Sequence, residues 1–294
     1  MQKKESTSNF PRVLVLIPAF NSGPSLTRAI QSLQEDGCAH DILVVDDGSA
    51  EPQAPYVPTS SPTQVIRLHE NCGIAAALNA GLRYAAHQGY EFVARLDADD
   101  VSLPGRLQSQ VERLDANDDV VVVGTWTQFV DERGRQRYVQ RGKDDDKWLK
   151  RAMHFLSPFS HPSLMFRTRV AMEVGGYPNR YTNLAEDYDF LWRLAARGKF
   201  SMLERPLVRC TVTQSGLSIS RRRAQLRARR NLQWEHIDAT LPAWLGLITT
   251  VALQLVPVPL LTAAKGLTTS LRSHRGVASS ASTSPSGGAV DSVE

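Results

Sequence analysis

The amino-terminal half of the chain alternates short apolar runs with segments of helical spacing. Residues 12–17 and 42–45 are continuous and apolar, which is typical of strands buried in a parallel sheet. Residues 25–34 and 74–87 repeat apolar side chains at helical intervals. This alternation favours βαβ units, so we predict an α/β domain with a mostly parallel central sheet flanked by helices. Strands are also expected at 63–68, 92–96, 120–124, 163–166, 200–203 and 207–213, a hairpin at 125–138, and helices at 104–114, 147–156 and 185–197.

Two of the predicted strands end in acidic residues. One strand ends at Asp46, and the strand at 92–96 runs into Asp97, Asp99 and Asp100. Ligands bind at the carboxyl ends of strands in an open parallel sheet, and crowded carboxylates are relieved by water, by a basic side chain or by a hard cation. The pattern therefore predicts either a ligand site or a solvated acidic turn that caps the next helix.

The phosphate-binding motifs of two large enzyme classes are missing from the chain. No Gly-x-Gly-x-x-Gly follows the first strand and no P-loop lysine motif is present, which argues against a dinucleotide enzyme or an NTPase. Acids without a glycine cradle hold phosphates through a bridging metal ion, and Mg²⁺ or Mn²⁺ is commonly held by one or two carboxylates together with substrate phosphates. Asp97-Ala98-Asp99 supplies such a pair, and the ion would offset the charge of a departing diphosphate.

Five short motifs, in order along the chain, resemble those of family 2 glycosyltransferases with the GT-A fold. They are Ile17-Pro18-Ala19-Phe20-Asn21, Val44-Val45-Asp46-Asp47-Gly48-Ser49, Asn71-Cys72-Gly73 with Asn79-Ala80-Gly81, Leu96-Asp97-Ala98-Asp99-Asp100, and Ala185-Glu186-Asp187. The resemblance implies an enzyme that moves a sugar from a nucleotide-diphosphate sugar, most often a UDP-sugar, to a hydroxyl of a saccharide or lipid-linked acceptor. It also suggests a part in surface polysaccharide synthesis.

The resemblance assigns donor-binding roles to residues at the strand ends. It implies that Pro18, Ala19 and Asn21 line the nucleotide pocket and that Asp46 binds the base, typically uracil. Asp97 would contact the ribose or the water shell of the metal ion. Asp47 and Ser49 are not assigned to the site, and we expect Asp47 to be a turn residue around Gly48.

The resemblance also implies a metal ligand and a catalytic base. Asp99, with Asp97, would hold Mn²⁺ or Mg²⁺, and Asp187 would take the proton from the acceptor hydroxyl, with Glu186 positioning the acceptor or the base. One base and one metal ion fit an inverting single displacement. The alternative for Asp187 and Glu186 is a favourable interaction with the dipole at a helix start. Processive relatives carry a Gln-x-x-Arg-Trp motif, which Gln233-Trp234 does not match, so transfer of a single sugar is expected.

Charge is unevenly distributed along the chain. Lys and Arg number 34 against 30 Asp and Glu, but six arginines fall between Arg221 and Arg230. A nucleic-acid-binding protein that grips phosphate through this cluster is one alternative function, yet it leaves the acidic strand ends unexplained, so we expect no nucleic acid partner. A sugar-nucleotide nucleotidyltransferase is a second alternative, although the glycine-rich signature with a nearby Lys or Arg that such enzymes commonly carry is missing from the loop at 18–23.

The carboxyl-terminal segment predicts contact with a membrane. Residues 241–264 are apolar and uncharged but contain three prolines, and basic residues flank them. We expect this segment to lie on the cytoplasmic membrane face, with a single span or a helix packed on the domain as alternatives. The predicted organisation is a polar tail at 1–10, a catalytic domain at 11–218, a basic and apolar helical segment at 219–272, and a disordered tail at 273–294. Because residues 1–9 lack a secretory signal, we expect a cytoplasmic protein held at the inner face of the membrane.

Overall fold

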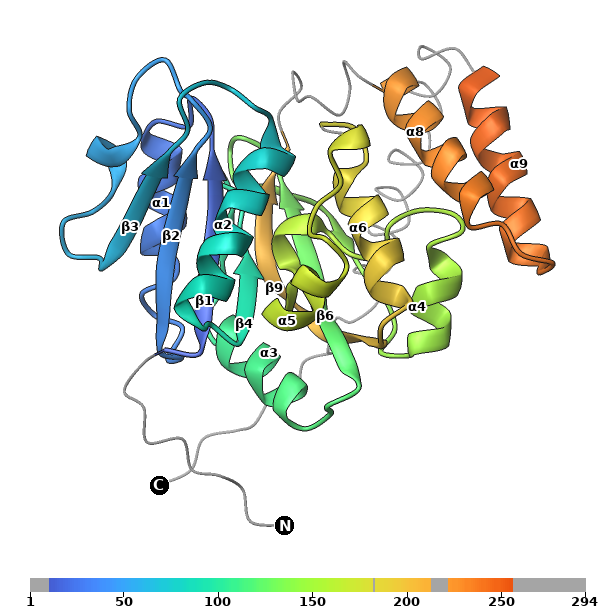
Figure 1. The fold of residues 1–294 in the computed structure, drawn as a ribbon, viewed down its shortest axis with the longest axis horizontal. Helices are drawn as coiled ribbons and strands as arrows, with labels where there is room; N and C mark the ends of the chain where they lie inside the picture. Colours follow the sequence, from blue (N-terminus) through green and yellow to red (C-terminus); the bar gives the residue numbers. More distant parts are fainter. Residues whose placement is uncertain (1–10, 182, 213–221, 256–294) are drawn as a thin grey trace, which may run out of the picture. The chain divides into compact units, whose positions relative to one another are not determined.

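Nine strands form one mixed sheet in the computed structural model, which describes residues 11–181, 183–212 and 222–255 (Figure 1). The strands are β1 Val13–Ala19, β2 His40–Asp46, β3 Thr63–Arg67, β4 Phe92–Arg95, β5 Val101–Ser102, β6 Val120–Val130, β7 Gln136–Gln140, β8 Met165–Arg167 and β9 Lys199–Thr211. They follow the order β3-β2-β1-β4-β8-β6-β9-β5, and β7 pairs with β6. The first four are parallel, as predicted, whereas β8 runs antiparallel to both β4 and β6.

Helices cover both faces of this sheet, within the compact unit to which the described residues up to Thr250 belong. The helices are α1 Pro24–Gln31, α2 Ile74–Gln88, α3 Arg106–Asp115, α4 Asp146–Ala152, α5 Thr168–Glu173, α6 Glu186–Ala195, α8 Arg222–Glu235 and α9 Leu241–Leu255, with single turns at Ala54–Tyr56, His161–Ser163 and Asn179–Tyr181. Side chains of α1 and α3 pack with Val13, Val15 and Ile17 of β1. Those of α2, α4, α5 and α6 pack with Leu14 and Leu16. Both faces of β1 are covered, which is why the strand is apolar throughout.

The strand order places the two acidic strand ends on either side of β1. Strand β1 pairs with β2 on one side, where Ala19 lies opposite Asp46, and with β4 on the other, where Leu16 lies opposite Arg95. Because these strands are parallel, their carboxyl ends reach the same edge of the sheet. The acidic ends of β2 and β4 therefore lie at one edge of the sheet, on either side of β1.

The last strand differs from the prediction. The sequence predicts separate strands at 200–203 and 207–213, whereas the structure has the single strand β9. A register shift against β6 lets the chain pass Pro206, whose missing N–H would interrupt a regular ladder. The predicted hairpin is present, with β6 continuous from Val120 to Val130. Strand β5 and helix α5 were not predicted, because each is too short to show a clear period.

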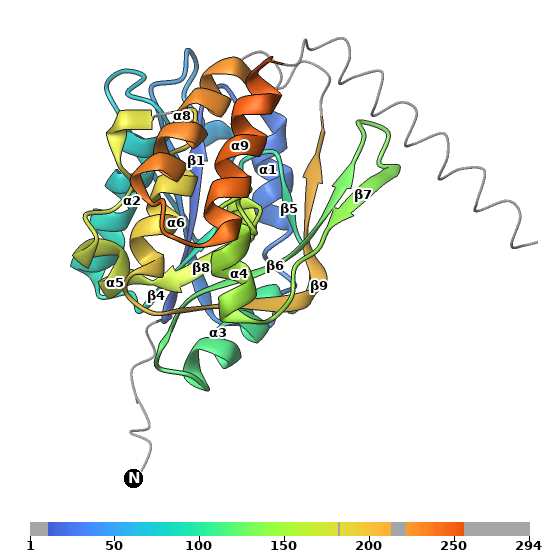
Figure 2. The same cartoon turned by 90° about the vertical axis from the view of Figure 1, so that its right-hand side faces the viewer.

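The basic and apolar segments near the carboxyl terminus form helices α8 and α9, which Figure 2 shows in front of α6. Gln233 of α8 donates to the carbonyl oxygen of His154 at 2.5 Å. Arg229 donates from Nε and Nη2 to Oγ1 of Thr250 in α9, at 3.1 and 2.9 Å. The α9 backbone passes so close to His154 that a Cβ atom on Gly246 would lie 1.9 Å from the carbonyl oxygen. Up to Thr250, the alternative of a helix packed on the domain is therefore the observed one.

The domain boundaries proposed at residues 10, 218 and 272 stay predictions. Residues 1–10, 213–221 and 256–294 lie outside the described part of the chain, and with them the boundaries at 10, 218 and 272, the tail expected from 273 onward and the end of the 241–264 segment. Among the helices of the described ranges, none is long and apolar enough to cross a membrane.

Candidate active site

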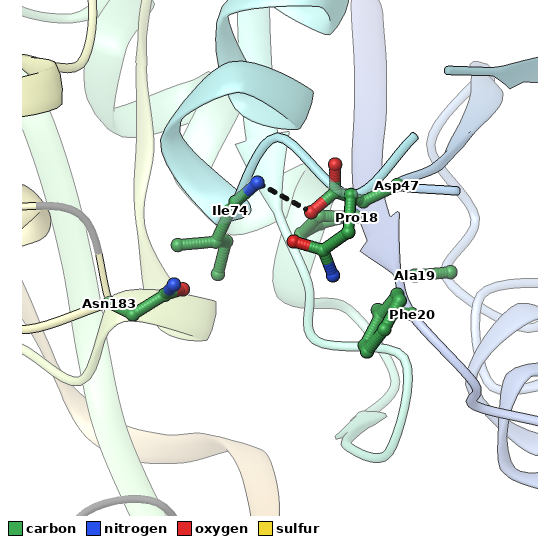
Figure 3. A pocket seen from close by; sticks show the side chains of 8 residues that line it. Pro18, Ala19, Phe20, Asp47, Ile74 and Asn183 are labelled. Carbon is green, nitrogen blue, oxygen red and sulfur yellow. Dashed lines mark hydrogen bonds between the residues drawn. The ribbon is translucent and has the colours of Figure 1, made fainter. Parts of the chain in front are cut away.

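A cavity of about 320 Å³ opens at the carboxyl end of β1 (Figure 3). Its lining residues come from the ends of β1 and β2, from the start of α2 and from the loop before α6: Pro18, Ala19, Phe20, Asp47, Asn71, Gly73, Ile74 and Asn183. In Figure 3, Pro18, Ala19 and Phe20 lie on one side, and Ile74 and Asn183 lie opposite them. Two of the predicted donor-binding residues, Pro18 and Ala19, therefore do line a cavity.

Two other predicted donor-binding residues are turned away from this cavity. Asp46 has no exposed surface, and its carboxylate accepts the backbone N–H groups of Ser49 at 2.9 Å and Gln53 at 3.2 Å. The Asn21 side chain accepts the N–H of Ala50 at 2.9 Å. Both side chains fix the loop that follows β2, so the geometry does not support the predicted contact of Asp46 with the nucleotide base.

Asp47, which we predicted to be a turn residue, is the acid of this pair that lines the cavity. Its two carboxylate oxygens accept the N–H groups of Cys72 and Gly73, each at 2.9 Å, at the start of α2. The second of these bonds is the dashed line in Figure 3. Burial raises the pKa of Asp47, and the two N–H groups act against that rise. At Gly48, φ is +66° and an added Cβ would lie 2.4 Å from the Glu70 carbonyl carbon, so glycine is required for the loop to turn here.

The acidic segment after β4 is organised by a buried arginine. Nη2 of Arg95 lies 2.6 Å from Oδ1 of Asp97, and the Arg95 side chain is almost completely buried. Its Nε and Nη1 have no hydrogen-bond partner among the described residues. Asp99, by contrast, is exposed, although desolvation of its carboxyl and the negative charge of Asp97 raise its pKa. Asp97 is therefore held in place by a cation, while Asp99 is free to meet a ligand.

The residues left out of the predicted site are structural. Asp100 is buried and accepts a hydrogen bond from Sγ of Cys210 at 3.0 Å, so its side chain faces β9. His161 lies 2.9 Å, nitrogen to oxygen, from the hydroxyl of Tyr177, and burial lowers its pKa well below the usual range. His161 is therefore hydrogen-bonded within the fold.

The two acids that begin α6 have different surroundings. Glu186 is buried and its Oε2 accepts the N–H of Leu184 at 3.0 Å, so this carboxyl fixes the loop before the helix. Asp187 is half-buried, and Oδ1 accepts the N–H of Tyr188 at 2.8 Å. Burial raises the pKa of Asp187, Arg95 acts against that rise, and the charge of Asp97 adds to it. The structure therefore brings Asp187 into the electrostatic field of the Arg95–Asp97 pair at the end of β4.

Comparison with known proteins agrees with this geometry. The family model described as Glycosyl transferase family 2 matches residues 14–175, more than half of the chain. The chain belongs to glycosyl transferase family 2. It is 29% identical over 191 residues to the amylovoran biosynthesis glycosyltransferase AmsE of Erwinia amylovora, covering 63% of this chain and 70% of that protein. It is 30% identical over 192 residues to the Escherichia coli UDP-Gal:alpha-D-GlcNAc-diphosphoundecaprenol beta-1,3-galactosyltransferase, covering 63% of this chain and 68% of that protein.

Solved structures confirm the fold of this family 2 glycosyltransferase. S. aureus TarS 1-349 in complex with UDP-GlcNAc matches with a TM-score of 0.63 at 21% identity, over 78% of this chain and 67% of that one. The mannosyltransferase PcManGT of Pyrobaculum calidifontis, in complex with GDP-Man and Mn²⁺, matches with a TM-score of 0.58 at 19% identity, over 89% and 81%. Both likenesses support the predicted GT-A fold, and the two bound donors carry different nucleotides.

Asp97 and Asp99 of this family 2 enzyme could supply some, but not all, of the ligands of a metal ion. Among the described residues, no three His, Cys, Asp or Glu side chains gather as a complete ligand set. Mg²⁺ and Mn²⁺ do not require one, because one or two carboxylates suffice when substrate phosphates and water supply the remaining oxygen ligands. Desolvation, and after it the negative charge of Asp97, raise the pKa of Asp99, and a bound cation would favour the charged form of both carboxylates. The two carboxylates therefore fit a divalent ion shared with a diphosphate.

Phe20 belongs to the loop at 18–21 that the resemblance places at the nucleotide pocket, and its side chain is 49% exposed in the structure. Sequence reasoning assigned no cavity role to Asp47 or to Asn183. Asn183 adopts φ of +60° in the loop before α6, and no local pattern predicts that it faces Phe20 across the cavity (Figure 3).

Glu186 gives the enzyme a testable dependence of stability on pH. Burial and the charge of Asp187 raise the pKa of Glu186 to about 7 from an ordinary value of 4.5. Between these values the folded state holds a proton that the unfolded state lacks, so this group favours folding at low pH and loses that contribution as pH rises through about 7. The Glu186→Gln variant is expected to melt at a higher temperature than the wild type at about pH 8, by a few degrees given roughly 2–4 °C per kcal/mol, with a smaller difference near pH 5.

Melting curves followed by circular dichroism measure this effect. Glu132→Gln, an exposed position in the turn between β6 and β7, is the matched control and should melt like the wild type at both pH values. A difference between Glu186→Gln and wild type that is the same at both pH values would contradict the assigned protonation.

Proposed function

We propose that this family 2 enzyme transfers a single sugar, with inversion, from a UDP-sugar to a hydroxyl of a saccharide or lipid-linked acceptor in surface polysaccharide synthesis. The observation that carries the proposal is the position of Asp187, at the start of α6 and within the field of the Arg95–Asp97 pair. The names of two relatives, one in amylovoran biosynthesis and one that acts on a diphosphoundecaprenol-linked sugar, support the class of acceptor.

The cavity at the end of β1 is the proposed donor site. Phe20 offers an aromatic face for a nucleotide base, because exposed aromatic rings stack on bases. Asp47 uses lone pairs of both carboxylate oxygens on backbone N–H groups and retains others that can accept an N–H of the base. We therefore assign base recognition to Asp47 and a supporting role in the loop to Asp46.

Asp187 is the proposed general base. A half-buried carboxylate with a raised pKa holds a proton more firmly than an exposed one, which favours removal of the proton from an acceptor hydroxyl during attack on the sugar. Glu186 positions this base by fixing the loop at the start of α6. Asp97 and Asp99 would hold Mn²⁺ or Mg²⁺, which supplies positive charge to the leaving diphosphate when bound.

A donor screen tests the proposal. Purified protein is incubated with Mn²⁺ and a panel of UDP-, GDP- and dTDP-sugars, and release of nucleoside diphosphate is measured with and without a cell-envelope extract. We expect release from a UDP-sugar, stimulated by the extract and lost on addition of EDTA. Release of pyrophosphate from a nucleoside triphosphate and a sugar phosphate would instead identify a nucleotidyltransferase. Mass analysis of the product identifies the acceptor.

We also propose that α9 attaches the enzyme to the cytoplasmic membrane face. Leu241, Trp244, Leu245 and Ile248 recur at helical spacing and are exposed, Trp244 by 47% and Ile248 by 59%. The opposite side of the helix is buried, so this apolar stripe is left without a partner among the described residues. An exposed apolar stripe beside a basic helix is typical of helices that lie in a membrane interface.

Charged substitutions on this stripe test membrane attachment. The double change Trp244→Glu and Ile248→Glu is expected to weaken binding to vesicles of anionic phospholipid at least about tenfold, because burying each apolar side chain contributes about 1.5–3 kcal/mol. Met172→Glu, on the exposed side of α5, is the matched control and should bind like the wild type. Sedimentation with vesicles measures the bound fraction, and equal binding of all three proteins would exclude α9 as the anchor.

A further inference from the structure

A second cavity, of about 220 Å³, lies beside Asp187. The loop before α6 contributes to both cavities, since Asn183 lines the one at the end of β1 and Leu184 lines this one. Ser157 and the start of α6 also line it, and helix α8 contributes Arg222, Gln225, Leu226 and Arg229. The proposed base therefore lines a cavity that is separate from the donor cavity. Arg222 and Arg229 of the arginine cluster line the same cavity.

The fold divides the arginine cluster between two sides of α8. Arg222, Leu226 and Arg229 follow one another at spacings of four and three residues, which places them on one face of a helix. Arg223 and Arg227 are exposed on the other side. A sequence that looks uniformly basic is thus sorted by the helix into cavity residues and solvent residues.

The two cavity arginines form no ion pair with a carboxylate among the described residues, although Asp187 lines the same cavity. Arg229 bonds to the Thr250 hydroxyl and to no carboxylate, and it is half-buried. Burial lowers its pKa, the hydroxyl of Tyr188 acts against that fall, and the positive charge of Arg222 adds to it. Holding a half-buried cation next to another cation is unfavourable unless an anion joins them. This part of the cavity wall is therefore suited to bind a negatively charged ligand.

Arg222 and Arg229 do not act as counterions of Asp187, the proposed base. The cation that stabilises the charged form of Asp187 is Arg95, on the side of the sheet edge. No ion pair joins Asp187 to α8 in the part of the chain that the structure describes. A ligand in this cavity would meet a proton acceptor at one end and free positive charge at the other.

We propose that this cavity binds the acceptor, with its reacting hydroxyl at Asp187 and a phosphate or diphosphate ester group at Arg222 and Arg229. One guanidinium group can donate two parallel hydrogen bonds to two oxygens of a phosphate, which makes arginine well suited to bind such esters. Seven residues of helix separate the two arginines by about 10 Å along the axis, so a diphosphate reaches both better than a single carboxylate does. The inference rests on the proposed function and names its acceptor as a sugar linked through phosphate.

Binding of hexyl diphosphate tests the site without catalysis. The full chain is titrated calorimetrically in EDTA with hexyl diphosphate, and with hexyl glucoside as a neutral probe. Three proteins are compared: wild type, Arg222→Gln, and the matched control Arg223→Gln, which makes the same change at the neighbouring, exposed position. We expect Arg222→Gln to weaken diphosphate binding by about tenfold to a hundredfold, the loss of a hydrogen bond to a charged group, while Arg223→Gln binds like the wild type.

Two further measurements separate this inference from its alternatives. UDP binding in Mn²⁺ should be the same in all three proteins, because the arginines do not line the donor cavity. Weaker UDP binding in Arg222→Gln, equal loss in Arg223→Gln, or no binding of hexyl diphosphate to the wild type would each overturn the proposed acceptor site. Arg229→Gln should resemble Arg222→Gln, with melting curves to check its contact with Thr250. If the donor screen fails while Arg222-dependent binding persists, the proposed function fails and the anion site stands.

Discussion

Replacing Asp187 by Asn is expected to lower kcat by about 10²–10⁴-fold, because proton removal by a positioned base contributes that much in a typical enzyme. The amide keeps the shape of the side chain and can still accept the N–H of Tyr188, so the start of α6 should fold as before. Loss of the base removes an interaction made only in the transition state, so kcat should fall while binding of the nucleotide sugar is kept. Initial rates against donor and acceptor concentration separate these effects.

Asp189→Asn is the informative control for this result. Asp189 is buried two positions later on α6 and pairs with Arg180 at 2.5 Å and with Arg193 at 3.2 Å. Its substitution should lower the melting temperature and leave kcat of the folded enzyme near that of the wild type. If Asp187→Asn turns over at the wild-type rate, another group is the base and the proposed mechanism is wrong.

Replacing Asp99 by Asn is expected to remove the response to Mn²⁺. Asp99 is the exposed acid of the pair, whereas Asp97 is held by Arg95, so Asp99 is the carboxylate most available to a cation. We expect kcat to fall by about 10²–10³-fold, the usual cost of removing one electrostatic contact to developing negative charge. Mn²⁺ affinity, measured in the presence of UDP by electron paramagnetic resonance of the free ion, should weaken at least about tenfold.

Asp100→Asn provides the comparison for Asp99. It makes the same change one position later, but Asp100 is buried against Cys210. Its Mn²⁺ affinity should match that of the wild type even if its melting temperature changes. If Asp99→Asn binds Mn²⁺ as tightly as the wild type does, Asp99 is not a ligand of the metal ion.

Local sequence was sufficient for most of the longer elements and for the positions of the acids. The apolar runs that become β1, β2 and β4 are continuous because both faces of these strands are covered, and burial of that kind leaves a local signature. The acids after β4 and at the start of α6 stand in short motifs, so the candidate ligands and the candidate base were found by inspection. A strand interrupted by Pro206 was not predicted, because its pairing with β6 is set by a distant register shift.

The tertiary structure alone decided which side chains face the ligands. Asp46 and Asp47 are adjacent and chemically alike, yet Asp46 is committed to Ser49 and Gln53, while Asp47 bonds to the start of α2 and lines the cavity. These partners lie up to 26 residues away in the sequence, so no local pattern could separate the two acids.

The arginine cluster shows the same division between sequence and structure. The sequence determined that positive charge is concentrated near residue 225, and that charge suits a phosphate or an anionic membrane equally well. Packing of α8 decided that Arg222 and Arg229 meet the cavity beside Asp187 while Arg223 and Arg227 meet solvent. The sequence thus determined the fold class, the family and the chemical groups, because these depend on local pattern. The direction in which each group points depends on contacts between distant segments, which only the folded chain provides.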